Sequence, residues 1–332
     1  MKINIAEQDI IFLSYDEPNA EKNYVDLVNK VPWAKRAHGV DGSDAAHKAC
    51  AELSDTKHFV TVDGDTVIDQ KFLDVVLDLD ELGVDDDYQF SWCGNIDING
   101  LKYSNGSLKM WTKDFVANMK THENTDGSDD TQIEFCYFDN YYQLNQNFST
   151  SIISSTPHQA WRAGFREGVK MSLDRGIKVD PDNFEKSLHD KNYHRLLVWC
   201  NIGRDIENGL WAMYGTRLGC YLTNLDPNFD FVNVADFKWH TEYWTNEIMP
   251  KFASADDYDE YDIKTKYRWN REKLEKETER LGIELNKKLN IPVSEFNAEG
   301  SKFFKKVYWN PPRMGNLVTE KDSEGRIKYK TI

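Results

Sequence analysis

The stretch FVTVDGDTVID, residues 59–69, places two aspartates, Asp63 and Asp65, directly after a short run of apolar and β-branched residues. An Asp-Gly pair is the strongest short signal for a β-hairpin, so a hairpin is the simplest interpretation. A calcium-binding EF-hand loop starting at Asp63 is a second one, but that loop needs glycine at its sixth position, where this chain has Ile68. The EF-hand interpretation is therefore excluded.

The residues that follow the two aspartates argue against the hairpin as well. Phe72, Val76 and Leu79 recur at helical rather than alternating spacing, which predicts a helix over 69–79. The pattern is then a buried strand, an acidic turn and a helix. Open α/β sheets hold their ligands at the carboxyl ends of such strands, and a pair of carboxylates there suits a hard divalent cation. A purely structural turn is the alternative.

The first third of the chain alternates between strand and helix signals. This alternation is typical of a parallel, doubly wound sheet, so the predicted fold class is α/β. The sequence contains neither G-x-G-x-x-G after its first strand nor G-x-x-x-x-G-K-[ST], which argues against dinucleotide-binding and P-loop chemistry. The expected strands are 10–14, 36–40 and 58–62, and the expected helices are 19–30, 43–54 and 69–79.

Further elements are predicted in the middle and the C-terminal part of the chain. Thr156 and Pro157 are a typical N-cap and first residue of a helix. Tyr267, Leu274 and Leu281 fall seven residues apart on a helix that we expect Gly282 to end. Strands are also expected at 88–94 and 132–138, and another helix at 205–218.

Composition sets the broad class of the protein. With 332 residues, of which 40% are hydrophobic, the chain can bury the core of one large or two smaller domains. Its apolar runs fall far short of the roughly 20 residues that a membrane span needs, and residues 1–9 lack a signal-peptide core, so we expect a cytoplasmic protein. The five cysteines form no C-x-x-C pair and indicate neither a zinc site nor a disulfide framework.

Charge is distributed unevenly along the chain, whose net charge is −15. Residues 264–332 hold 17 Lys and Arg against 10 Asp and Glu, a balance of +7, which leaves 24 against 46, or −22, for residues 1–263. We therefore expect a catalytic domain over 1–245 and a helical, basic C-terminal extension over 246–332 that packs on it.

Residues 9–241 resemble the nucleotide-sugar-dependent glycosyltransferases of the GT-A fold, especially the large inverting family 2. The segments FLSYDEPN (12–19), AHK (46–48) and DGD (63–65) carry the resemblance, although Cys50 stands where the family has a small glycine. The resemblance implies a GT-A-like doubly wound mixed sheet and a UDP-sugar donor. The implied donor contacts are Tyr15, Asp16 and Glu17 near the nucleotide, Asp41 at the uracil, and His47 and Lys48 near the diphosphate.

In that family the DGD segment is the D-x-D motif, which implies that Asp63 and Asp65 hold Mg²⁺ or Mn²⁺. Such an ion bridges diphosphate oxygens and stabilises the charge of the departing nucleotide. Residues 229–244 are expected to run from a strand into His240, which the resemblance implies as a further metal ligand. Imidazole nitrogen is a suitable ligand for manganese.

The segment GRDIENGLWAMYGTRLGCY, residues 203–221, is similar to the Glu-Asp motif of the family. The resemblance implies Glu207 as the general base, with Asp205 as the alternative because the two acidic residues are not adjacent here. A structural interpretation stands beside it, since acidic residues are favoured in the first turn of a helix by its dipole.

Among GT-A enzymes the chain most resembles glycosyltransferases of tailed bacteriophages, in particular hydroxymethylcytosine DNA arabinosyltransferases. NGLWAMYGTRLG (208–219) is one of the segments that carry this likeness. It implies transfer of arabinose from a UDP-sugar to the hydroxymethyl group of 5-hydroxymethylcytosine in phage DNA, in the host cytoplasm. A GT-A enzyme with a glycan or protein acceptor and a metal-stabilised binding module without catalysis are the alternatives.

A DNA acceptor needs a basic surface, and residues 301–316 combine basic and aromatic side chains without any acidic one. Lysines can neutralise phosphates while aromatic rings stack on bases. A basic strand packed on the sheet is the structural alternative. The expected DNA contacts are Lys302, Lys305, Lys306 and Arg313.

Overall fold

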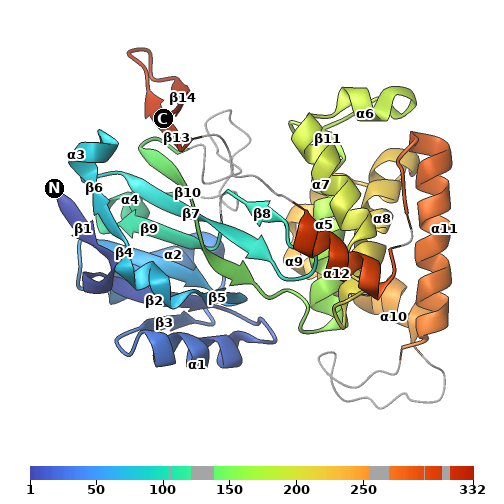
Figure 1. Cartoon of the computed structure of the whole chain (residues 1–332), viewed down its shortest axis with the longest axis horizontal. Helices are drawn as coiled ribbons and strands as arrows, with labels where there is room; N and C mark the ends of the chain where they lie inside the picture. The colour runs from blue at the N-terminus through green and yellow to red at the C-terminus, as the bar shows by residue number, and fades with distance from the viewer. Residues whose placement is uncertain (105, 121–137, 254–268, 295, 309–314) are drawn as a thin grey trace. The chain divides into compact units, whose positions relative to one another are not determined.

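The computed structural model describes residues 1–104, 106–120, 138–253, 269–294, 296–308 and 315–332. The chain forms two compact units (Figure 1). Unit 1 comprises residues 1–96, 102–152 and 310–332, and unit 2 comprises residues 97–101 and 153–309.

These units do not follow the expected boundary between residues 245 and 246. Residues 153–245 pack with the later helices because α5, α7 and α8 contact one another and α8 also contacts α11. Residues 317–331 return to unit 1 because they extend its sheet. The basic C-terminal part is therefore divided between the two units rather than forming one extension.

The described part of unit 1 is built on a ten-stranded mixed sheet with the order β14-β13-β10-β7-β9-β4-β2-β3, in which β5 also pairs with β10 and β8 with β7. The strands are β2 (Asp9–Ser14), β3 (Lys35–His38), β4 (His58–Asp63), β5 (Thr66–Ile68), β7 (Gln89–Ile96), β8 (Lys102–Tyr103), β9 (Leu108–Thr112), β10 (Tyr141–Ser151), β13 (Leu317–Lys321) and β14 (Ile327–Thr331). The helices are α1 (Ala20–Lys30), α2 (Ser43–Leu53), α3 (Leu79–Leu82) and α4 (Lys113–Asn118). The expected mixed α/β fold class is confirmed.

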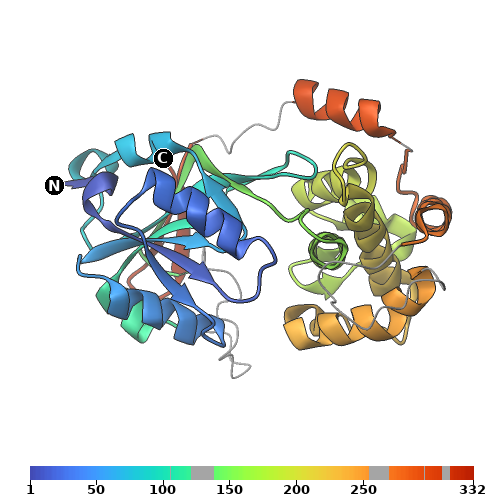
Figure 2. The same cartoon turned by 90° about the horizontal axis from the view of Figure 1, so that it is seen from below.

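The two faces of this sheet carry separate cores, because successive side chains of a strand point to opposite faces. Ile10 and Phe12 of β2 belong to the core that includes Leu27 of α1. Ile11 between them belongs to the core that includes Cys50 of α2. Figure 2 shows α1 and α2 on opposite sides of the sheet. Burial on both faces explains the near-continuous apolar runs of β2 and β4.

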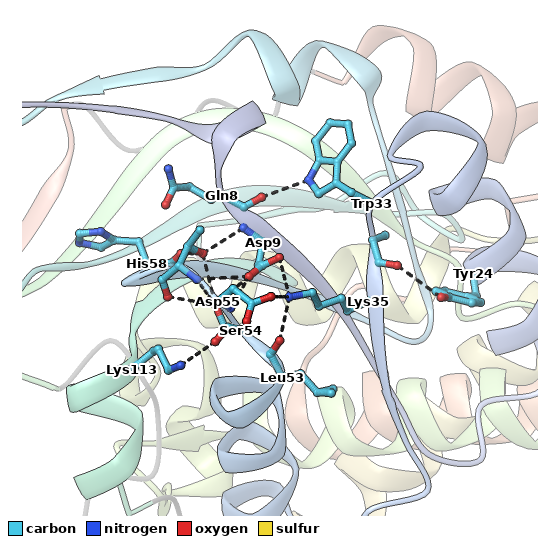
Figure 3. A network of polar contacts seen from close by, with 12 residues as sticks. Gln8, Asp9, Tyr24, Trp33, Lys35, Leu53, Ser54, Asp55, His58 and Lys113 are labelled. Carbon is cyan, nitrogen blue, oxygen red and sulfur yellow. Dashed lines mark hydrogen bonds and ion pairs between the residues drawn. The ribbon is translucent and has the colours of Figure 1, made fainter.

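A polar network joins the amino ends of β2 and β3 to the connection between α2 and β4 (Figure 3). Asp9 Oδ2 accepts hydrogen bonds from the Ser54 hydroxyl at 3.2 Å and from the Asp55 backbone N–H at 2.5 Å, while Lys35 Nζ lies 3.0 Å from Asp9 Oδ1. Burial raises the pKa of the Asp9 carboxyl, but its bonds to Lys35, Asp55 and Ser54 outweigh burial and leave that pKa below the ordinary value. The network therefore favours a charged Asp9 in the folded protein.

The helix expected over 69–79 is wrong. The chain forms β5, a 3₁₀ turn over Gln70–Asp74 and then β6 (Val76–Asp78), which pairs with β1 (Lys2–Asn4). Phe72 and Leu79 are buried as the helical pattern requires, but Val76 is exposed. Pairing with a strand from the start of the chain thus overrides the local spacing.

The described part of unit 2 is mainly helical. Its helices are α5 (Pro157–Met171), α6 (Phe184–Ser187), α7 (Asp190–Asn201), α8 (Gly209–Leu225), α9 (Phe237–Tyr243), α10 (Met249–Phe252), α11 (Arg271–Leu289) and α12 (Ala298–Val307), and a short hairpin joins β11 (Leu173–Asp174) to β12 (Ile177–Lys178). The predicted start of α5 is confirmed, since the Thr156 hydroxyl accepts from the Gln159 N–H and Pro157 is the first helical residue.

Glycines allow α5 and α8 to pack with their backbones in contact. A Cβ at Gly164 would clash with the Ala212 carbonyl, and one at Gly215 would clash with the Trp161 carbonyl. Gly168 and Gly219, one turn farther along the two helices, are equally close to the opposite backbone. Any larger side chain at these positions would force the two helices apart.

Three other expectations for unit 2 need correction. The helix expected from residue 205 begins at Gly209. The helix expected to end at Gly282 continues to Leu289, and the left-handed Asn290 follows it. Residues 231–243 form a 3₁₀ turn and α9 instead of a strand leading to His240. Residues 132–137 of the strand expected at 132–138 lie outside the described residues. Within the described ranges, no helix is both long and apolar enough to cross a membrane.

Candidate functional site

Three neighbouring parallel strands end at one edge of the sheet in unit 1. Leu13 of β2 pairs with Asp63 of β4, and Ser14 of β2 pairs with His38 of β3. This is the edge at which open α/β sheets bind ligands. The candidate residues that follow these strand ends are Tyr15, Asp16 and Glu17 after β2, Asp41 after β3, and Asp65 after β4.

The turn between Asp63 and Asp65 is held by its backbone. The Asn23 side-chain amide donates to the Gly64 carbonyl at 3.1 Å, and the Ile152 N–H donates to the Asp65 carbonyl at 2.7 Å. A Cβ at Gly64 would lie only 2.5 Å from Glu17 Oε2, so a larger residue there would displace that carboxylate from its present position. The turn thus brings Glu17 against the D-x-D segment.

Glu17 adds a third carboxylate to this turn. The Tyr15 backbone N–H donates to Glu17 Oε2 at 2.8 Å. Burial raises the pKa of Glu17, and the negative charges of Asp16 and Asp63 raise it further, while the backbone hydrogen bonds act in the opposite direction. The carboxylates therefore repel one another, and a bound cation would relieve that repulsion.

The donor set of this edge fits a hard divalent cation when a diphosphate completes it. Within the described residues, no group of three or more His, Cys, Asp or Glu is arranged to hold a metal ion. Magnesium sites of nucleotide-dependent enzymes commonly use one or two carboxylates together with substrate phosphates. Asp63 and Asp65 can supply those carboxylates.

His47 lies close to this edge but is buried in α2. One of its ring nitrogens, Nδ1, donates to the Ser43 carbonyl at 2.8 Å, and its ring meets Trp111 edge-on. Burial lowers the pKa of His47, and the charge of Lys109 lowers it further, whereas the Ser43 bond and the charge of Asp63 oppose these effects. A neutral imidazole results at neutral pH, so His47 offers no fixed positive charge to a diphosphate.

Lys109 is a residue of this region to which the sequence patterns assigned no role. It lies in β9 opposite Thr61 of β4, is buried, and donates from Nζ to the Gly106 carbonyl at 2.9 Å. A lysine inside the buried strand LKMWT was a usable signal, because lysine is rarely buried without a specific partner. Its charge acts on His47, which itself feels the charge of Asp63.

The other residues expected to contact the UDP-sugar donor are more exposed to solvent. Tyr15, Asp16 and Asp41 are exposed, and Lys48 is half-buried on α2. Gly39 precedes Asp41 with φ of +71°, a conformation that glycine adopts readily. Exposure leaves these side chains accessible to a ligand, and their expected roles stay predictions.

The two candidates for the catalytic base lie in unit 2, in the turn before α8. Asp205 Oδ2 lies 2.6 Å from Lys305 Nζ of α12, and both side chains are largely buried. Glu207 is exposed and forms no hydrogen bond or ion pair within the described residues. Asp205 is thus engaged in an ion pair, while Glu207 is free to meet a substrate hydroxyl.

Glycines shape this turn. Gly203 has φ of +152°, and a Cβ on Gly209 would clash with the Gly203 carbonyl. The Gly203 N–H donates to the Ser301 hydroxyl of α12 at 3.3 Å. The turn is therefore closed at its base and attached to α12.

The environment of His240 does not support the metal-binding role expected for it. His240 is fully buried in unit 2, where its Nε2 donates to the Val234 carbonyl at 3.0 Å. Burial lowers the pKa of His240 to about 4, the Val234 bond opposes this, and the charges of Arg166 and Arg162 lower it further. Two guanidinium groups would repel a metal cation rather than attract one.

The lysines expected to contact DNA lie on α12, which is a helix and not the basic strand of the alternative interpretation. Lys302 and Lys306 are exposed, and Phe303 between them is 66% exposed. Lys305 is paired with Asp205 and also donates to the Ile98 carbonyl at 3.1 Å, so it is not free to meet a phosphate. Arg313 lies outside the described residues.

Comparison with known proteins gives few matches. No protein-family model and no curated protein matches the chain. Among solved structures, HddC from Yersinia pseudotuberculosis matches with 16% identity over 42% of this chain and 68% of that chain, with a TM-score of 0.23. A glycosyltransferase involved in the glycosylation of the major capsid of PBCV-1 matches with 12% identity over 33% of this chain and 62% of that chain, with a TM-score of 0.21.

The match thus spans less than two thirds of the second structure. TM-scores this low carry no argument about fold or function. The α/β fold class rests on the mixed sheet and the helices themselves.

Proposed function

We propose that this chain is a glycosyltransferase that moves a sugar from a UDP-sugar to 5-hydroxymethylcytosine in phage DNA, with arabinose as the expected sugar. One observation carries the proposal. The D-x-D segment, the loop containing Glu17 and the loop containing Asp41 all follow the carboxyl ends of the neighbouring parallel strands β4, β2 and β3. The sequence resemblance supplies the reaction type.

In this proposal the donor lies along that edge. Asp41 would contact the uracil, and Asp63 and Asp65 would hold Mg²⁺ or Mn²⁺ beside the diphosphate. A divalent cation at that position supplies charge neutralisation for the nucleotide diphosphate as it departs. Lys48, half-buried on α2, is a cationic side chain of the same unit that would assist in binding phosphate oxygens.

Glu207 is proposed to accept the proton of the acceptor hydroxyl. Its exposed carboxylate has no competing partner within the described residues, whereas Lys305 engages Asp205. General-base assistance of this kind typically contributes a rate factor of about 10² to 10⁴.

The side chains of α12 are the basis for proposing DNA as the acceptor. Lys302 and Lys306 are four residues apart and therefore lie on the same side of the helix, next to the exposed Phe303. Such a combination suits phosphate neutralisation with aromatic contact to a base. The acidic balance of residues 1–263 makes a localised basic surface necessary for any DNA contact.

Nucleoside mass spectrometry tests this function. DNA containing 5-hydroxymethylcytosine is incubated with the protein, a divalent cation and a panel of UDP-sugars, and unmodified cytosine DNA is treated in parallel. We expect a glycosylated nucleoside from the modified DNA alone. Asp65→Asn should abolish it while Asp55→Asn, an exposed aspartate at the opposite edge of the sheet, should leave it unchanged.

Two results contradict the proposal in different ways. Release of UDP from UDP-sugars without any modified nucleoside would replace DNA by a glycan or protein acceptor. Wild-type transfer by Asp65→Asn, with folding verified by circular dichroism, would remove the D-x-D segment from the reaction altogether.

A further inference from the structure

The turn that carries Glu207 is held on its N-terminal side by a largely buried lysine. Lys305 of α12 pairs with Asp205, two residues before Glu207, and also donates to the Ile98 carbonyl. All of these residues belong to unit 2. One side of the turn is therefore attached to the segment 97–101.

The other side of the turn is held through Asn208, the residue that follows Glu207. The Asn208 side-chain amide donates to the Ser154 carbonyl at 2.8 Å, and it does not cap α8, which begins at Gly209. The Ser154 hydroxyl donates in turn to Asp97 Oδ2 at 2.5 Å. The Asp97 carboxylate is therefore joined to the turn through one intervening residue, Ser154.

Both oxygens of the Asp97 carboxylate are hydrogen-bonded. Besides the bond from the Ser154 hydroxyl, Oδ1 accepts from the Ile153 N–H at 3.2 Å. Burial raises the pKa of Asp97, and the bonds from Ser154 and Ile153 oppose that effect. Because a buried carboxylate is costly without hydrogen bonds, Asp97 and the 153–154 segment hold each other in place.

The two attachments of the turn meet at neighbouring residues. Ile98 receives the bond from Lys305, and Asp97 receives the bond from Ser154. Glu207 lies between the two attached positions and is itself exposed. A general base acts only within hydrogen-bond reach of the proton that it accepts. The position of the Glu207 backbone must therefore come from its neighbours in the turn.

We propose that Asp97 is a positioning residue for the transfer reaction, because it fixes through Ser154 and Asn208 the backbone that presents Glu207. The inference rests on the proposed function, since it takes Glu207 as the general base. Asp97 is assigned no contact with a substrate. A carboxylate that only stabilised the fold would lower the transfer rate whatever side chain stood at position 207.

Transfer kinetics of Asp97→Asn, Glu207→Gln and the double variant test the proposal on the full-length protein. We expect Asp97→Asn to lower kcat by at least about tenfold at unchanged KM for the UDP-sugar, because small displacements of a reacting group cost up to about 100-fold. The double variant should lose no more than about twofold beyond Glu207→Gln, because a base that is absent cannot be misplaced.

The matched control is Asp180→Asn, in another turn of unit 2. Asp180 also accepts one backbone and one side-chain hydrogen bond, from the Asp182 N–H and the Asn183 amide, so we expect an unchanged kcat. Asn208→Ala is the second test variant, because it breaks the same connection without removing a helix cap. It should show the same loss as Asp97→Asn, again without a further loss beside Glu207→Gln.

The possible outcomes separate this inference from the proposed function. Losses that multiply in the double variant would overturn the inference, since Asp97 would then act independently of Glu207. A wild-type rate in Asp97→Asn beside a slow Glu207→Gln would remove the positioning role alone. A wild-type rate in Glu207→Gln would remove the proposed base and the positioning role with it.

NMR of the Asn208 side-chain amide gives a readout that needs no turnover. We expect Asp97→Asn to shift this resonance and Asp180→Asn to leave it in place. An unshifted amide in Asp97→Asn would show that the carboxylate is not coupled to the turn. That result contradicts the inference whether or not any acceptor is modified.

Discussion

Lys305 Nζ lies 2.6 Å from Asp205 Oδ2, and the two side chains are 18% and 13% exposed. Lys305 also donates to the Ile98 carbonyl, so one lysine joins α12, the turn before α8 and the segment 97–101. From the sequence we expected Lys305 to contact DNA and named Asp205 as the alternative general base, which are two unrelated functions. The ion pair instead indicates that the two residues together stabilise the fold.

Lys305→Met should lower the free energy of unfolding by about 3 kcal/mol, because Asp205 would remain largely buried without its counter-ion. Lys302→Met, on the exposed part of the same helix, should change it by less than about 0.5 kcal/mol. Urea unfolding followed by tryptophan fluorescence measures both. Similar values for the two variants would show that the ion pair contributes little.

Glu207→Gln should retain UDP binding but lower the transfer rate by at least about 100-fold, because a neutral amide cannot accept the acceptor's proton. Glu185→Gln, another exposed glutamate of unit 2, is the matched control. Calorimetry with UDP and a transfer assay separate binding from turnover. If Glu207→Gln transfers at the wild-type rate, the base lies elsewhere.

Lys302→Ala/Lys306→Ala should weaken DNA binding and reduce the slope of log affinity against log salt by about 1.8, or 0.9 for each duplex phosphate that is no longer neutralised. Lys305 is left intact because its replacement would disturb α12. Lys287→Ala/Lys288→Ala removes the same charge from exposed positions of α11 and should preserve the slope. Fluorescence anisotropy over a salt series gives both slopes, and an unchanged slope in the α12 variant would exclude this surface.

Asp9→Asn should reduce stability by about 2 kcal/mol at neutral pH, because Asp9 accepts several hydrogen bonds as a charged group. The folded pKa of Asp9 lies below its ordinary value of 3.8. Its charge therefore stabilises the fold above that value, and the contribution is lost as pH falls through the folded pKa. The difference between wild type and variant should shrink in acid.

Urea unfolding at pH 7 and pH 3 tests this dependence. Asp55→Asn is the control, because Asp55 also pairs with Lys35 but has a side chain that is 91% exposed. Exposed pairs contribute little, so we expect a change within about 1 kcal/mol. A pH-independent difference for Asp9→Asn would mean that the carboxylate charge is not what stabilises the network.

Short sequence patterns correctly predicted the elements that depend on burial and capping within the same stretch of chain. The apolar run of β2, the helix α1 and the N-cap of α5 were all anticipated, because burial on both faces and capping leave direct marks in the sequence. Residues 69–79 were misassigned because β6 pairs with a strand from the first residues of the chain, which no local window contains.

The residues of the candidate site also divide into those whose position local patterns predicted and those whose surroundings depend on distant parts of the chain. The strand-end position of the D-x-D segment followed from the order of strands and helices. The environment of His240 could not be predicted from that order, because its neighbours Arg162 and Arg166 lie on a helix far away in the sequence. Ion pairs such as that of Asp205 with Lys305 also join residues about a hundred positions apart, and composition cannot reveal them.

The return of the chain to unit 1 has a consequence for its synthesis on the ribosome. Tyr141 of β10 pairs with Thr319 of β13, and all the described helices of unit 2 are encoded between them. The Tyr141–Gln143 part of β10 must therefore remain without its partner strand β13 until translation has passed those helices. A waiting strand edge is a template for aggregation, so nascent chains of this protein should need chaperone protection until β13 emerges.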